Sequence, residues 1–224
     1  GVMRLDVRNE ALETHYIDAM ELLELRHEGD EMVVPAGRSG PVALRTLTAL
    51  TQVFDSRGRN VARQLATVDG SVFASEPALL REAARGTAAP EDHLELTVSR
   101  RELGAVAGDS LALMLTMRSS LMSTVVFYEH MLAKAGARSL DWVGKDLSRI
   151  TTVAQVARWY TGNFGLRVEV RDGSEWRGVV RLMDFGPVAW RNVAAILPPV
   201  SGDSIRVRLL FAPDEFHVDR LAVK

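Results

Sequence analysis

Residues 166–182 read LRVEVRDGSEWRGVVRL, and this stretch decides the class of the fold. Leu166, Val168 and Val170 alternate with charged residues, which is the two-residue period of a strand that buries one face. Asp172-Gly173 is a tight-turn signal, and a second apolar-rich run follows it. The stretch therefore predicts an antiparallel β-hairpin.

Three more strands are expected between this hairpin and the C-terminus. One runs from Val188 to Ile196 and stops at Pro198-Pro199, and a turn at 213–215 separates the other two. Short antiparallel strands joined by turns are typical of β-sandwiches and jelly rolls. We therefore predict a mainly β fold, with β-sandwich or jelly-roll (galactose-binding-like) sheets and two or three inserted helices.

The residues before this C-terminal third mix strands with helices. Residues 94–98 alternate as a strand does, and 111–117 are apolar on both faces, as in a central strand. Ser120 and a capping box at 152–155 each start a predicted helix, and we expect these helices to cover sheet edges or ends. The predicted organisation is an N-terminal β-rich part at 1–118, a helical insertion at 119–165 and a C-terminal antiparallel β-sandwich part at 166–224.

The N-terminal residues show the same strand–loop–strand pattern as the C-terminal ones. Residues 4–8 and 16–25 predict two strands around an acidic loop, as 205–211 and 216–223 do. In each pair the second strand carries an apolar residue followed by Asp, which resembles the closing strands of galactose-binding-like jelly rolls. Residues 1–25 are therefore expected to close a sandwich begun upstream, unless the two hairpins are alike only because hairpins share a pattern. The start at Gly1-Val2, without an initiator Met or a signal peptide, suggests either a removed leader or a part of a longer polypeptide.

Composition and charge exclude several function classes. The 224 residues include 27 basic and 29 acidic ones, interleaved along the chain, and a nucleic-acid-binding protein would show a basic excess or stripe. The absence of cysteine excludes disulfides, thiolate metal sites, cysteine nucleophiles and a lipidated cysteine. The most apolar stretch, 111–132, carries Arg118, Glu129 and His130, so it does not predict a membrane span.

No catalytic motif is present. The five histidines form no His-Glu-x-x-His or His-x-x-x-His pair, and the sequence has no Gly-x-Ser-x-Gly elbow, Walker loop or Rossmann fingerprint. We therefore predict no catalytic residue, no cofactor and no metal. A carboxylate pair for hydrolysis stays open, because such pairs are defined in space and not by spacing.

Four residues make up the speculative ligand or interaction surface. Trp176 and Trp190 are expected on adjacent strands, where exposed indole rings stack on sugars, although tryptophans in such sandwiches more often anchor the core. Asp18 and Asp219 follow apolar residues in the proposed closing strands. In sugar-binding sandwiches an Asp at this place supports the ligand edge or a structural calcium, and the plainer alternative is a turn or strand-end cap.

Several motifs together resemble an uncharacterised β-sandwich region of large exported bacterial proteins, found there beside FG-GAP/VCBS-type propeller repeats or tetratricopeptide arrays. The matching stretches are ETHYID at 13–18, ELLELRH at 21–27 with Pro35, DSRGRNV at 55–61 with Asp69-Gly70 and Phe73, SLMSTVVFY at 120–128 with Met131-Leu132, LDW at 140–142, GPVAW at 186–190, Phe211 and 216–221. The propeller motif and its calcium-loop aspartates are absent. The resemblance implies an extracytoplasmic bacterial setting (periplasmic, cell-surface or secreted) and a scaffold role, with no catalytic residues to carry over.

These observations predict a non-catalytic extracytoplasmic interaction or scaffold domain that contributes a protein-binding surface to a larger chain or envelope assembly. Its expected partner is a protein or the rest of a larger polypeptide, with no nucleic acid and no membrane span. The first alternative is a carbohydrate-binding β-sandwich module, and the second is a hydrolase with dispersed acidic residues.

Overall fold

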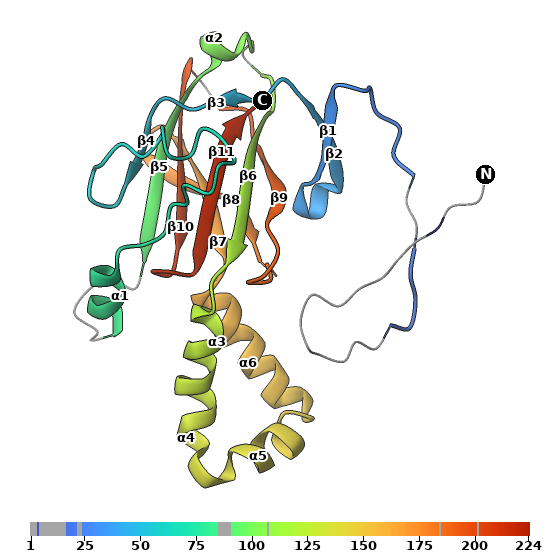
Figure 1. Ribbon diagram of the computed structural model, residues 1–224, viewed down its shortest axis with the longest axis vertical. Coiled ribbons are helices and arrows are strands. Elements are labelled where there is room, and N and C mark those ends of the chain that lie inside the picture. The colour runs from blue at the N-terminus through green and yellow to red at the C-terminus, as the bar shows by residue number, and fades with distance from the viewer. Residues whose placement is uncertain are drawn as a thin grey trace.

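The computed structural model describes residues 4, 17–21, 24–84, 91–106, 108–183, 185–200 and 202–224. Two antiparallel sheets form most of it (Figure 1). The five-stranded sheet has, in spatial order, β4 (Val53–Asp55), β5 (Asp92–Ser99), β10 (Ser204–Phe211), β7 (Leu166–Asp172) and β8 (Glu175–Leu182). The four-stranded sheet has β3 (Thr48–Ala49), β11 (Phe216–Val223), β6 (Leu111–Ser119) and β9 (Arg191–Leu197).

The two sheets share one core. Each strand turns one face toward that core, so apolar and polar residues alternate along its sequence. Leu94 and Leu96 of β5 belong to the same buried cluster as Leu113 and Leu115 of β6. Every second side chain of a strand points to that core, so burying it removes apolar surface from water. The prediction of a mainly β fold with inserted helices is confirmed.

The hairpin at 166–182 forms as its sequence predicts. Val168 of β7 lies opposite Val180 of β8, and Gly173 in the connecting turn has a φ of +60°. Such a φ is disfavoured for residues with a Cβ, so glycine suits this position. The strands of this hairpin pair onward with β10, and β10 pairs with β5. Each of the two large sheets therefore combines strands from 48–119 with strands from 166–224.

A small hairpin covers the outer face of the four-stranded sheet. Its strands are β1 (Glu31–Pro35) and β2 (Pro41–Arg45), joined by a 3₁₀ turn at Gly37–Ser39. Small and flexible side chains of the sheet meet it in a second buried cluster: Val34, Ala36, Leu44, Ala112, Met114, Ala194 and Ala222. This cover explains why the stretch 111–117 is apolar on both faces.

The N-terminal residues do not form the expected strand where they are described. Residues 17–21, 24 and 25 have no strand conformation, so the prediction of a strand over 16–25 is wrong there. A strand needs a neighbour to pair its backbone groups, and these residues have none in the described part of the chain. Of the strand expected at 4–8, all but Arg4 lies outside the described residues.

The helices were expected along sheet edges or at sheet ends, and the inserted helices lie at the ends of the sheets and not along their edges. After α1 (Pro77–Ala84) and α2 (Arg100–Leu103), the remaining helices lie between β6 and β7 and project away from the sheets (Figure 1). They are α3 (Met122–Phe127), a π-helical turn (Tyr128–Leu132), α4 (Ala133–Ala135), a 3₁₀ turn (Gly136–Arg138), α5 (Ser139–Asp141), a second π-helical turn (Trp142–Asp146) and α6 (Ile150–Asn163). We call residues 121–163 the arm. Helix α6 begins at Ile150 without a side-chain cap, so the capping box at 152–155 marks its start wrongly.

Candidate functional site

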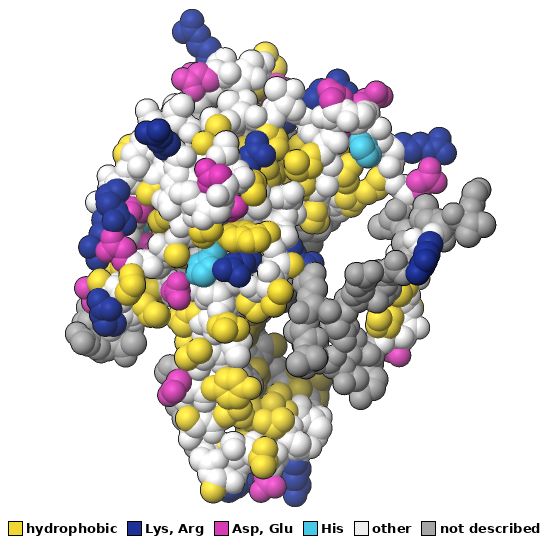
Figure 2. All heavy atoms as spheres, viewed as in Figure 1, with side chains coloured by type: hydrophobic (Ala, Val, Ile, Leu, Met, Phe, Trp, Pro, Cys, Tyr) yellow, Lys and Arg dark blue, Asp and Glu magenta, His cyan; other side chains and the backbone are white. Residues whose placement is uncertain are grey.

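The arm exposes large apolar side chains. None of its described side chains is buried. The most exposed are Leu140 at 85%, Ile150 at 80%, Leu121 at 62%, Tyr128 at 57% and Val125 at 54%. Hydrophobic side chains gather along the visible face of the arm (Figure 2). Large apolar side chains that are exposed close together mark an interaction site more often than singly scattered ones do.

A cavity of about 800 Å³ lies where the arm meets the sheets. Helices α3 and α6 form one side of it and the ends of β7, β8 and β10 form the other. Its walls are largely apolar, with Leu121, Val125, Val126, Trp159, Phe164, Leu210 and Phe211. Glu91 and Arg167 also line it and form an ion pair with each other. The volume is in the range of sites that bury a small molecule or several side chains of a partner.

The β10–β11 turn, residues 212–215, holds both ends of the arm. Before the arm, Ser120 donates its backbone N–H to the carbonyl oxygen of Glu215 (2.8 Å) and its hydroxyl to the carbonyl oxygen of Asp214. After the arm, Gly165 donates its N–H to Oε1 of Glu215 (2.5 Å). One short turn therefore fixes the base of the arm against the sheets.

Glu215 is buried at this junction, with 4% of its surface exposed. Burial raises the pKa of its carboxyl to about 7, although N–H groups of Gly165 and Ala212 and the charge of Arg181 act in the opposite direction. A raised carboxyl pKa beside a cavity is also a mark of catalytic acids. Here, however, both carboxylate oxygens accept backbone N–H groups, from Gly165 and Ala212. Glu215 thus serves as an anchor for the arm.

Gly165 is required where the arm returns to the sheets. Its φ is +99°, and a Cβ on it would lie 2.8 Å from Cγ of Met183 and 3.0 Å from Cγ of Arg181. The preceding Phe164 packs its ring against Trp159 and Tyr160 of α6, at centroid distances of 5.5 Å and 5.2 Å. The end of α6 is therefore locked to the edge of the cavity.

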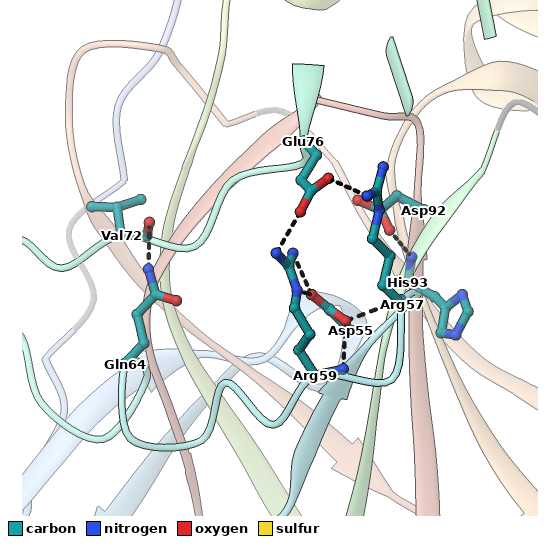
Figure 3. A network of polar contacts seen from close by, with 8 residues as sticks. All are labelled: Asp55, Arg57, Arg59, Gln64, Val72, Glu76, Asp92 and His93. Carbon is teal, nitrogen blue, oxygen red and sulfur yellow. Dashed lines mark hydrogen bonds and ion pairs between the residues drawn. The ribbon is translucent and has the colours of Figure 1, made fainter. Parts of the chain in front are cut away.

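A separate polar network joins β4 to the start of α1 (Figure 3). Arg59 forms ion pairs with Asp55 (2.6 Å) and Glu76, and Arg57 forms one with Glu76 (2.8 Å). Burial raises the pKa of Asp55, but hydrogen bonds from Arg59 and the backbone outweigh it, so the pKa lies below its usual value. Asp55 and Glu76 each have an arginine partner, which suits a structural role better than proton transfer.

The structure places the four speculative surface residues on different segments of the fold. Trp176 lies on β8 and Trp190 precedes β9, so they belong to different sheets and not to adjacent strands. Asp219 in β11 is 3% exposed and accepts N–H groups from Gly70 (3.2 Å) and Asp69 (3.4 Å), as a turn cap does. Asp18 is exposed in the N-terminal segment.

Guanidinium groups accompany both tryptophans. Arg208 lies over the ring of Trp176 at 4.5 Å, and Arg118 lies over the ring of Trp190 at 5.1 Å. A cation on an indole face contributes to stability and occupies the surface that a sugar ring would stack on. One face of each ring is therefore already in contact within the chain.

The sequence reasoning missed the exposed arm and Glu215. Leu121, Val125 and Tyr128 show helical spacing, but spacing alone does not say whether a face meets the sheets or solvent. Glu215 reads only as part of a turn after Pro213, since nothing local signals its burial.

No helix in the described part of the chain is long and apolar enough to cross a membrane. Over the same residues, no group of three or more His, Asp or Glu side chains is arranged to hold a metal ion. In the comparisons with known proteins, no family model matches the chain and no curated protein matches it significantly.

Proposed function

We propose that this chain is a non-catalytic interaction domain that binds a partner protein through its arm. The strongest support is that the arm buries none of its described side chains and exposes large apolar residues along its length. Exposing such residues to water is unfavourable, and burial against a partner would recover that free energy. The extracytoplasmic setting and the scaffold role belong to the same proposal and rest on the sequence resemblance.

The occupant we propose is an amphipathic helix of the partner. Leu121 directly precedes α3, Val125 lies in it and Tyr128 directly follows it. Their spacing of i, i+4 and i+7 forms one stripe, which we call the α3 stripe. The stripe borders the cavity, which Leu121 and Val125 also line. An apolar stripe beside an apolar cavity suits recognition of a helix by its own apolar face, with side chains at the same spacing.

Site-specific crosslinking tests this proposal. A photoreactive residue replaces Val125 in one variant and the exposed Val106, beside α2, in the control. We expect a discrete crosslinked protein at position 125 only, identified by mass spectrometry and then purified. Val125→Glu should weaken its binding at least tenfold in a direct titration, because a carboxylate would be buried without a partner. Equal crosslinking at both positions, or unchanged affinity of the variant, would contradict the proposal.

We also propose that the two sheets form a jelly roll. With β3 and β5 to β11 numbered as eight successive strands, the orders β3-β11-β6-β9 and β5-β10-β7-β8 become 1-8-3-6 and 2-7-4-5. This is the arrangement of a double-sheet jelly roll with two Greek keys, and β4 extends one edge.

The closing contact of this arrangement can be tested by a disulfide, because the chain has no cysteine of its own. Ala49 of β3 lies opposite Ala222 of β11. We expect A49C/A222C to crosslink on oxidation and A49C/A195C, whose second position lies on β9, to stay reduced. The opposite result would rule out this strand order.

The two alternatives have less support. A sugar site needs an accessible indole face near polar groups, and Trp176 and Trp190 lie on different sheets with guanidinium groups over them. A hydrolase needs convergent carboxylates free to exchange protons. Glu91 beside the cavity is paired with Arg167, and Glu215 is held by backbone N–H groups.

A further inference from the structure

The end of the arm differs in charge from the rest of the chain. Residues 133–150 contain four basic residues and two acidic ones, a net charge of +2, so the other 206 residues carry 23 basic and 27 acidic ones, a net charge of −4. Lysine is used only three times in the whole chain, and two of the three lysines lie in this stretch. We call residues 133–150 the tip.

The tip also carries the most exposed apolar side chains of the chain's described part. Leu140 is 85% exposed and Ile150 is 80% exposed, with Val143 at 46% beside them. Trp142 lies between Leu140 and Val143 and is half-buried. Figure 1 places α5, which contains Leu140, at the end of the arm farthest from the sheets.

Charged side chains surround these apolar residues. Arg138, Lys145 and Arg149 are exposed, and Arg149 pairs with Asp146 (3.2 Å). Figure 2 shows basic and acidic side chains together at the end of the arm. Apolar side chains with a tryptophan and long basic side chains around them are the composition of segments that sit in the interface of a bilayer, with rings and aliphatic groups below the headgroups and cations among them.

We propose that the tip inserts into the surface of an anionic lipid bilayer. Two observations favour a bilayer over a second protein surface. The most exposed apolar residues lie at a projecting end, which suits a flat partner, and the tip is positive on a chain that is otherwise negative, which suits an anionic one. This proposal uses the tip and not the α3 stripe, so it stands or fails separately from binding of a partner helix.

Co-sedimentation of the whole chain with vesicles tests the proposal. We expect binding to vesicles that contain phosphatidylglycerol, little binding to phosphatidylcholine alone, and weaker binding as salt is raised. L140S/I150S should reduce the affinity at least tenfold, because it removes the two apolar side chains that would insert. K145E should reduce it more than about fivefold, since each basic residue near an anionic surface contributes about that factor.

Val106→Ser is the matched control, because Val106 is 66% exposed beside α2 and outside the arm. It should bind anionic vesicles as the parent chain does, and circular dichroism should show all variants folded. Equal binding of L140S/I150S, or no binding to anionic vesicles, would overturn the proposal. Light scattering without lipid gives a further decisive outcome: a dimer that L140S/I150S abolishes, with no vesicle binding, would identify the tip as a self-association surface instead.

Discussion

Raising the pH from 5 to 8 should destabilise the folded chain through Glu215. The pKa of this carboxyl is about 7 in the folded chain, compared with an ordinary value of 4.5. Folding therefore favours the protonated form, so the contribution of this group to stability is fully present below about pH 4.5 and is lost as the pH rises through about 7. The difference between the two pKa values corresponds to about 3 kcal/mol of unfolding free energy, of which about 2.5 kcal/mol is lost between pH 5 and 8.

Urea unfolding followed by circular dichroism at pH 5, 6, 7 and 8 measures this loss. In Glu215→Gln the group no longer titrates, so its unfolding free energy should fall by about 2.5 kcal/mol less than that of the parent chain over this range. The variant should be less stable than the parent at pH 5 by about 1 kcal/mol, because the amide NH2 group cannot accept the backbone N–H group that the second oxygen of the carboxyl accepts. Glu175→Gln removes an exposed carboxylate and serves as the control for charge.

The change of unfolding free energy with pH, compared between the parent chain and Glu215→Gln, tests this prediction. If the parent chain and Glu215→Gln lose stability in parallel between pH 5 and 8, the junction does not hold a carboxyl with a raised pKa. If the parent alone gains stability as the pH rises, the backbone N–H groups outweigh burial, and Glu215 is anchored as a carboxylate throughout.

Three further substitutions test the base of the arm, a turn cap and the polar network by urea unfolding. Gly165→Ala should destabilise by about 2–4 kcal/mol through its clash with Met183 and its positive φ, whereas Gly162→Ala in α6, where a Cβ meets open space, should stabilise by up to about 1 kcal/mol. Asp219→Ala should lower the free energy of unfolding by about 1–3 kcal/mol, because two turn N–H groups lose their acceptor. The control Asp18→Ala should change it by less than about 0.5 kcal/mol. Similar effects of the two substitutions would refute the capping role of Asp219. The pKa of Asp55 in the folded chain lies below its ordinary value of 3.8, so its carboxylate stabilises the fold at pH values above 3.8. This contribution is lost as the pH falls through the lower pKa of the folded chain. Asp55→Asn should therefore destabilise the chain at pH 7 and lessen its loss of stability on acidification below pH 4.

The strands with one buried face were predictable from the sequence because the signal is local. Leu94, Leu96 and Val98 alternate with polar residues, and the structure buries all three. The turn at Asp172-Gly173 is equally local, since its conformation depends on one glycine. The pairing of these strands was not predictable, because β10 meets β5 across more than a hundred residues of chain.

The surface features were less predictable for the same physical reason. The exposure of Leu121 and the burial of Asp219 depend on which distant elements pack beside them. The residues next to them in the sequence do not determine that packing. Trp190 shows the difficulty plainly. Its distance from Trp176 in the sequence suits neighbouring strands, but the chain crosses from one sheet to the other between them.

The arm and the sheets obtain their stability from different sources. Isolated helices of about 12–15 residues or fewer are marginal in water, and most helical stability in proteins comes from packing of an apolar face. Helix α6 has 14 residues, none of them buried, and α3 has only 6. The contacts at the β10–β11 turn and the rings around Phe164 hold the base of the arm, but the described part of the arm beyond them has no core of its own. Binding at the α3 stripe or the tip would therefore stabilise the helices themselves as well as the complex, so either partner should protect the amide hydrogens of the arm from exchange more than those of the sheets.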